Sequence, residues 1–314
     1  MVEWQTPLLN INRCPIIILG VLGVRIPLPA VSYNKGVLMK YLLLVPALIF
    51  FLLFTLWPII KVIEMSFYQT NFIVTKFIGL QNYIDLMHNE PFLQSLKNSV
   101  LYLTVMPLLT VIVSVSVTFL IADLSKKWQD TSRILVYIPV LGGGIILAQV
   151  WRWVFAVNGL MNWILSLFNI APVHWFGEST LSIIIICCIV VTTTFGGYVI
   201  ILLASLTSID KSIYDAVKMD GASDFQIKMK IVLPMIKSTV ALIYLLSMIA
   251  SLQVFEYIYA LVPQQYAATI AYNIYISGFK NSKWGMASAQ AVLLMIITFI
   301  LSYFQRKISN ESNQ

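Results

Sequence analysis

The sequence predicts an all-α integral membrane protein with six transmembrane helices and a short cytoplasmic helix between the fourth and the fifth. Of its 314 residues, 59% are hydrophobic and only 11% are charged. The mean hydropathy is +0.86, and long apolar runs recur along the whole chain. A water-soluble enzyme and a disordered chain are both excluded, because neither carries so many apolar residues.

Six segments are apolar over the roughly 20 residues that a spanning helix needs. They cover residues 41–63, 99–122, 134–155, 180–206, 236–261 and 285–304. With the amino terminus inside, most of the 20 Lys and Arg residues lie on the cytoplasmic side, as the positive-inside rule requires. Both termini are therefore expected in the cytoplasm. The net charge of +7 reflects this topology, so we expect no nucleic-acid partner.

The amino-terminal leader, residues 1–38, differs from the rest. Its apolar stretch, 16–24, is too short to span a membrane and lacks a cleavage site of the signal-peptide type. The codons GTTCGAATCC, which are the T-loop consensus of transfer RNA genes, would encode Val24 to Ile26 and the first base of the next codon. We hypothesise that the leader is translated RNA-gene sequence and that the natural start is Met39. An ordinary amphipathic extension is the alternative.

The membrane domain is expected over residues 39–307, followed by a cytoplasmic tail, 308–314. Its Cys187 and Cys188 are adjacent in an apolar run, which suits neither a disulfide framework nor a zinc site. His88 and His174 both fall in predicted outer loops. No convergent set of catalytic or metal-binding side chains is therefore expected within the membrane.

The longest cytoplasmic loop, residues 209–234, contains two capping-box patterns. Ser212 precedes Asp215 by three residues, and Ser223 precedes Gln226 by three. Each pattern predicts the start of a short helix, with a glycine between them at 221 that allows the chain to turn. A solvated loop whose lysines only follow the topology is the alternative.

The same loop contains a longer motif. It reads Tyr214-Asp215-Ala216-Val217, then Asp220-Gly221-Ala222, then Ile231, Leu233 and Pro234. This spacing resembles the EAA loop of binding-protein-dependent ABC importer permeases, and the Asp-Gly-Ala form is typical of their maltose-type and glycerol-phosphate-type carbohydrate-uptake group. Further echoes of the family are Gly79-Leu80-Gln81-Asn82-Tyr83, Asn98, Asn162 and Trp284-Gly285.

The loop also departs from the family pattern. Asp215 stands where Glu is usual, Val217 replaces the second Ala, Asp210 replaces a Pro, and Val262-Pro263-Gln264-Gln265 replaces a Gly-Gly-Pro segment. These departures weaken the assignment to the best-studied sugar subgroups of the family, and therefore to any one sugar.

The resemblance implies a permease that forms half of a translocation pore. Its expected partners are a second permease subunit, a cytoplasmic ABC ATPase dimer, an extracytoplasmic solute-binding protein and a sugar. ATP is expected on the ATPase, with no cofactor on this chain, because the sequence lacks the G-x-x-x-x-G-K-[ST] phosphate loop. Import of a non-sugar solute such as a polyamine is the alternative, and a secondary transporter is a further one.

The resemblance assigns coupling to the ATPase to seven loop residues. These are Tyr214, Asp215, Ala216, Val217, Asp220, Gly221 and Ala222. Asp215 is expected either to make a polar contact with the ATPase or to cap its own helix.

Two sets of polar and aromatic residues are candidates for the substrate path. Gln253, Glu256 and Tyr257 have the i, i+3, i+4 spacing of one helical face, and so do Gln149, Arg152 and Trp153. Such faces could offer hydrogen bonds and ring faces to a hydroxyl-rich solute. The alternative places Arg152 and the tryptophans at the outer interface and lets Glu256 bond a neighbouring helix.

The third span contains residues that disfavour a continuous helix. Pro139 is followed by three consecutive glycines, residues 142–144. We expect this segment to weaken the helix, either for gating or to allow close packing.

Overall fold

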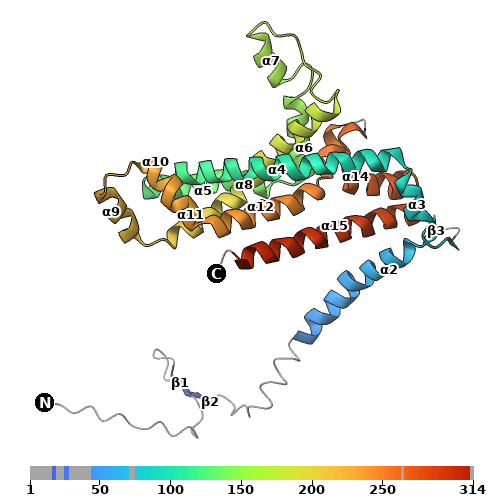
Figure 1. The fold of residues 1–314 in the computed structure, drawn as a ribbon, viewed down its shortest axis with the longest axis horizontal. Coiled ribbons are helices and arrows are strands. Elements are labelled where there is room, and N and C mark those ends of the chain that lie inside the picture. The colour runs from blue at the N-terminus through green and yellow to red at the C-terminus, as the bar shows by residue number, and fades with distance from the viewer. Residues whose placement is uncertain (1–15, 19–24, 28–43, 71–74, 263–264, 312–314) are drawn as a thin grey trace. The chain divides into compact units, whose positions relative to one another are not determined.

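The computed structural model describes residues 16–18, 25–27, 44–70, 75–262 and 265–311, and most of them are helical (Figure 1). The chain divides into two units, residues 1–61 and 62–314. In the first unit, β1 (Ile16–Ile18) pairs antiparallel with β2 (Arg25–Pro27). Met39 and most of the expected leader lie outside the described residues.

Among the described residues, four helices are long and apolar enough to cross a membrane. They are Leu44–Met65, α4 (Glu90–Ala122), α8 (Ser179–Thr207) and the Trp284–Phe304 part of α15 (Trp284–Glu311). Two bent pairs, joined at short breaks, raise the number to six if each pair is one span: α5 (Lys126–Leu141) with α6 (Gly144–Val154), and Asp224–Met235 with α12 (Lys237–Leu252). The predicted all-α membrane fold is confirmed in this form.

The remaining elements are short. The Leu44–Met65 helix contains a π-helical turn, η1 (Leu52–Leu56), before α2 (Trp57–Met65). The others in chain order are β3 (Tyr68–Thr70), β4 (Thr75–Phe77), α3 (Gln81–Met87), α7 (Leu160–Ser166), α9 (Lys211–Met219), α10 (Asp224–Ile227), η2 (Lys228–Val232), α11 (Leu233–Met235), α13 (Glu256–Leu261), η3 (Gln265–Ala267), α14 (Ile270–Tyr275) and η4 (Ile276–Lys280).

Small polar residues let α4 pack closely against α8 and α12. Thr110 and Thr118 of α4 are buried, and each hydroxyl donates to the carbonyl four residues earlier on its own helix. These side chains thus need no outside partner and leave room for neighbouring helices. Gly196 on α8 serves the same purpose, because a Cβ there would overlap the Val136 carbonyl of α5.

The third span is broken where its glycines predict weakness. Gly142 and Gly143 adopt extended backbone angles, and α5 and α6 meet at 96°. The predicted span 134–155 is therefore made of two helices, and the predicted weak point is confirmed. An extended glycine pair between two helices permits this sharp change of direction.

The fifth predicted span, 236–261, is also interrupted. Helix α12 ends at Leu252 and α13 begins at Glu256. The Thr269 hydroxyl donates to the Val254 carbonyl at 2.6 Å and thereby satisfies a backbone group that a continuous helix would bond internally. The break separates residues that sequence spacing placed on one face.

Within residues 62–314, α9 and α10 lie at one end of the α4–α8–α12 bundle and α3 and α14 lie at the other (Figure 1). We call these the α9 end and the α3 end. Buried amides tie the α3 end together: Nδ2 of Asn82 donates to the Ser66 and Tyr68 carbonyls, and Nδ2 of Asn98 donates to those of Tyr266 and Ala268. Asn82 and Asn98, two residues that this chain shares with the family, thus hold neighbouring segments together through hydrogen bonds.

Candidate functional site

Helix α9 begins at a different residue from the one that the capping pattern predicts. The Asp210 side chain accepts a hydrogen bond from the Ser212 amide at 3.0 Å and is the N-cap. Hydrogen bonds from the Ser212 amide, and then from its hydroxyl, lower the pKa of Asp210. Ser212 therefore lies inside the helix, and the predicted box with Asp215 is wrong. The expectation that Asp215 caps its own helix is therefore wrong as well.

The second predicted capping box is confirmed. Ser223 Oγ accepts from the Gln226 amide at 3.3 Å, and Gln226 Oε1 accepts from the Ser223 amide at 3.0 Å. This reciprocal pair satisfies two backbone donors at the start of α10.

The turn between α9 and α10 is a Schellman motif centred on Gly221. Gly221 has a φ of +82°, its amide donates to the Lys218 carbonyl, and the Ala222 amide donates to the Val217 carbonyl. Val217 and Ala222 also belong to one apolar cluster, which is the contact that accompanies this motif. Glycine is favoured here because a positive φ is costly for residues with a Cβ.

The loop motif divides into two faces. Tyr214, Val217 and Ala222 form the inner face, where they pack against the buried side chains of Phe119 and Val232. Burial raises the pKa of the Tyr214 phenol. Three of the seven predicted coupling residues therefore fasten the loop to its own chain.

The outward face of α9 carries the other four predicted residues and one that the prediction missed. It consists of Asp215, Ala216, Asp220, Gly221 and Met219, all of them exposed. Met219 is 84% exposed, the largest exposed fraction of any large apolar side chain among the described residues. The available signal was its i+4 spacing from Asp215, which places both side chains on the same side of the helix.

An ion pair fixes the loop to the end of α4. Lys228 Nζ donates to Asp123 Oδ2 and also lies 6.0 Å from the Phe119 ring centroid. The Lys228 side chain is only 23% exposed, and the two paired residues are 105 positions apart. No local pattern in the sequence indicates this contact. Together with the inner face, it attaches the α9–α10 segment and η2 to the end of α4.

The α6 candidates for the substrate path share one exposed face. Gln149, Arg152 and Trp153 all lie on this uninterrupted helix, and Trp153 is 79% exposed. The expected common face on this helix is present.

The second candidate set is divided by the break after α12. Gln253 lines a groove of about 370 Å³ with residues of α14 and α15. Glu256 instead adjoins the first turn of α6, where a Cβ on Gly144 would overlap its carboxylate. Tyr257 shares a hydrogen bond of 2.9 Å with the Thr193 hydroxyl of α8 and is half-buried. The expectation that these three residues share one helical face is wrong.

Among the described residues, the exposed Glu256 side chain has no hydrogen-bond or ion-pair partner. The alternative, in which Glu256 forms a hydrogen bond with a neighbouring helix, is therefore wrong for the described residues. Its carboxylate lies beside the amino terminus of α6, where the helix dipole favours negative charge.

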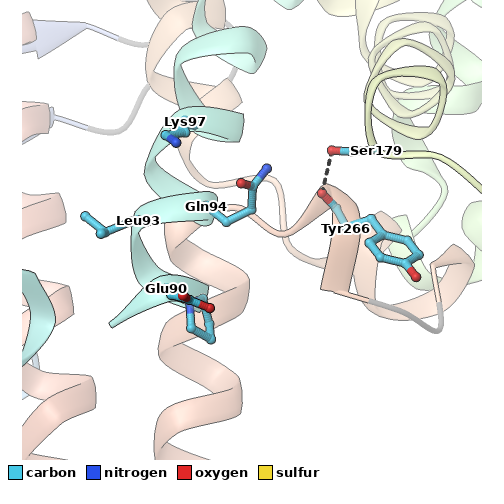
Figure 2. Close-up of a pocket in the computed structure, with 7 residues that line it drawn as sticks. Glu90, Leu93, Gln94, Lys97, Ser179 and Tyr266 are labelled. Carbon is cyan, nitrogen blue, oxygen red and sulfur yellow. Dashed lines mark hydrogen bonds between the residues drawn. The ribbon is translucent and has the colours of Figure 1, made fainter. Parts of the chain in front are cut away.

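A polar recess of about 530 Å³ opens at the α3 end. Figure 2 shows Glu90, Gln94 and Lys97 along the α4 side, facing Ser179 and Tyr266. The Ser179 hydroxyl donates to the Tyr266 carbonyl at 2.8 Å and closes the far side of the recess. The surface here offers both signs of charge.

Comparison with known proteins matches this arrangement to one family. The family profile described as "Binding-protein-dependent transport system inner membrane component" matches residues 131–311, which is more than half of the chain. The Bacillus subtilis protein named "Probable ABC transporter permease protein YurN" is 28% identical over 87% of this chain and 97% of its own length. "Trehalose/maltose transport system permease protein MalF" of Thermococcus litoralis is 31% identical over 84% and 92%.

A solved structure agrees with these relatives. A chain from the "Crystal structure of a bacterial ABC transporter involved in the import of the acidic polysaccharide alginate" superposes with a TM-score of 0.80 at 25% identity, covering 88% of this chain and 96% of that one. The present chain is accordingly a multi-pass, inner-membrane permease subunit of an ABC importer, and the ATPase is a separate subunit. It belongs to the family of binding-protein-dependent transport system inner membrane components.

Proposed function

We propose that this permease imports sugars or oligosaccharides and that the outward face of α9 receives the driving force from a cytoplasmic ABC ATPase. The α9 end would then lie in the cytoplasm together with both termini. A second permease subunit would complete the pore, and a solute-binding protein would deliver the sugar at the α3 end. The cargo named for the Thermococcus relative, trehalose or maltose, supports a carbohydrate substrate.

The observation that carries the proposal is the division of α9 into two faces. Met219 is apolar and 84% exposed, so it offers a contact that a partner protein can cover. Methionine is also a flexible side chain that suits a groove in a partner protein. The neighbouring Asp215 and Asp220 can add polar contacts at the rim of the same interface.

The inner face explains how a push on α9 would reach the membrane domain. Tyr214 and Val217 are packed against Phe119, which lies near the end of α4, and the Lys228–Asp123 pair joins η2, which follows α10, to the same end of α4. Packed side chains resist compression, so a displacement of α9 would move the ends of α4 and α8 with it. The ATPases would thereby switch the pore between its inward-facing and outward-facing states.

The path for the sugar is proposed along the exposed faces of α6 and the break after α12. Gln149 and Trp153 would contribute an amide and a ring, while Gln253 and Glu256 would accept or donate hydrogen bonds at the break. Tyr257 would support the path indirectly through its bond to Thr193. A polyamine is the second candidate cargo, because an unpaired carboxylate at Glu256 also suits a cation.

One experiment tests both parts in proteoliposomes that contain the whole transporter and its binding protein. Met219→Asp should abolish ATP-driven uptake while leaving insertion unchanged, because it places a charge in the proposed apolar contact. Trp128→Asp is the matched control, since Trp128 is 62% exposed on α5 and outside the outward face. When maltose, trehalose, arabinotriose and spermidine are each offered as labelled cargo, at least one of the sugars should be taken up and spermidine should not.

Two results would contradict the proposal. If Met219→Asp transports as well as Trp128→Asp, the outward face of α9 does not dock the ATPase. If spermidine is taken up and none of the three sugars is, the cargo is a polyamine.

A further inference from the structure

We propose that five aromatic side chains at the α3 end form a stacking surface for the ring faces of successive sugar units. This aromatic strip consists of Phe255, Tyr259, Tyr275, Phe279 and Trp284. The proposal rests on the carbohydrate cargo proposed above and adds a binding site to it.

The strip is a continuous series of ring contacts that crosses four elements. Ring centroids are 5.7 Å apart between Phe255 and Tyr259, 5.4 Å between Tyr259 and Tyr275, 5.3 Å between Tyr275 and Phe279, and 4.8 Å between Phe279 and Trp284. These residues come from the α12–α13 break, α13, the α14–η4 segment and the start of α15. Two of the four contacts are i, i+4 pairs, and the other two join residues of different elements, so the series as a whole depends on the tertiary fold.

One end of the strip packs against the apolar core, and other rings of the strip are exposed. Tyr272 is only 7% exposed and contacts Phe255 at 6.2 Å, so it anchors one end of the strip to the apolar core. Phe279 is 67% exposed and Tyr259 is 46% exposed, although both rings are in contact with neighbours. A contiguous exposed apolar surface of this kind is typical of a site that contacts a ligand or a partner.

An unpaired carboxylate argues that this surface faces water. Glu256 and Tyr259 lie at i and i+3 on α13 and so share a face of that helix. Glu256 is exposed and has no hydrogen-bond or ion-pair partner in the described part of the chain. A carboxylate facing lipid is strongly disfavoured, whereas one facing an aqueous cavity is not.

The far end of the strip has a polar rim. Residues 280–283, which are Lys280, Asn281, Ser282 and Lys283, follow Phe279 directly and are all exposed. A sugar presents apolar C–H faces and hydroxyl edges. Aromatic faces flanked by hydroxyl, amide and ammonium groups complement both parts of such a ligand. A row of rings offers this combination repeatedly, which fits an oligosaccharide better than a single small solute.

The test measures uptake by the complete transporter in proteoliposomes at saturating binding protein, with maltose, trehalose and arabinotriose as probes. Phe279→Ala should lower uptake of the transported probe by about threefold to tenfold, the loss expected for one stacking contact. Phe279→Tyr should restore it, because the ring is kept. The control is Phe168→Ala, since Phe168 is 71% exposed and lies outside the strip.

Each outcome bears on a different statement. Equal uptake by Phe279→Ala and Phe168→Ala, with the wild type transporting a probe, would overturn the stacking surface. So would loss of the second permease from the purified Phe279→Ala complex, because the strip would then be a subunit interface. Failure of the wild type to transport any of the three sugars would instead contradict the proposed function.

Discussion

The conformation of Gly221 offers a quantitative test of the coupling loop. Its φ of +82° lies in the left-handed region, and a Cβ added there would meet no atom within 4 Å. Substitution therefore costs backbone strain without any clash inside the chain. Alanine should cost about 1 kcal/mol and valine about 2 kcal/mol, while asparagine tolerates this conformation with little loss. A loss of about 2 kcal/mol lowers the population of the native turn roughly thirtyfold.

The assay is the number of sugar molecules taken up per ATP hydrolysed by the reconstituted transporter. We expect Gly221→Val to lower this ratio sharply, Gly221→Ala to lower it partly and Gly221→Asn to retain it. All three proteins should insert normally, because the turn lies outside the spans. An unchanged ratio in Gly221→Val would refute the reasoning. Equal loss in Gly221→Asn and Gly221→Val would show that bulk at this position matters instead of the turn.

Three further predictions concern the ion pair of the loop, the packing of α5 against α8, and the N-cap of α9. Lys228→Asp and Asp123→Lys should each reduce coupling, and the double variant should recover it, since the pair is worth about 1 kcal/mol in a double-mutant cycle of stability; two effects that simply add would contradict the contact. Gly196→Ala should destabilise the detergent-solubilised protein by about 1–3 kcal/mol through overlap with α5, whereas Gly197→Ala, with open space around it, should not; equal melting temperatures would count against the α5–α8 contact. The lowered pKa of Asp210 implies that its capping contribution is complete above the usual aspartate value of 3.8 and is lost as the pH falls through the lowered one. Hydrogen exchange of the Ser212 amide should therefore accelerate in strong acid, and Asp210→Asn should remove this pH dependence.

Much of the fold could be predicted from apolar runs, since membrane spans are set by length and composition. The breaks were harder. Gly142 and Gly143 gave a local signal for the first one, whereas the break after Leu252 depends on Thr269, a residue from a later segment that bonds the Val254 carbonyl. Periodicity within 236–261 could not reveal a partner outside it.

The candidate site shows the same limit. Spacing identified the loop, its glycine turn and the Ser223 box, because each depends on neighbours in the sequence. The Ser212 pattern failed because Asp210, two residues earlier, takes the capping position first. The separation of inner from outward residues depends on Phe119 and other distant side chains, so it required the structure.

Cysteine cross-linking between α9 and the ATPase measures the central claim most directly. Met219→Cys lies on the outward face, whereas Val217→Cys lies on the inner face against the bundle. In the assembled transporter, we predict that a short thiol-to-amine cross-linking reagent joins Met219→Cys to amines of the ATPase in high yield and leaves Val217→Cys unlinked. Absence of any cross-link from Met219→Cys in a transporter that still takes up sugar on ATP would contradict the account.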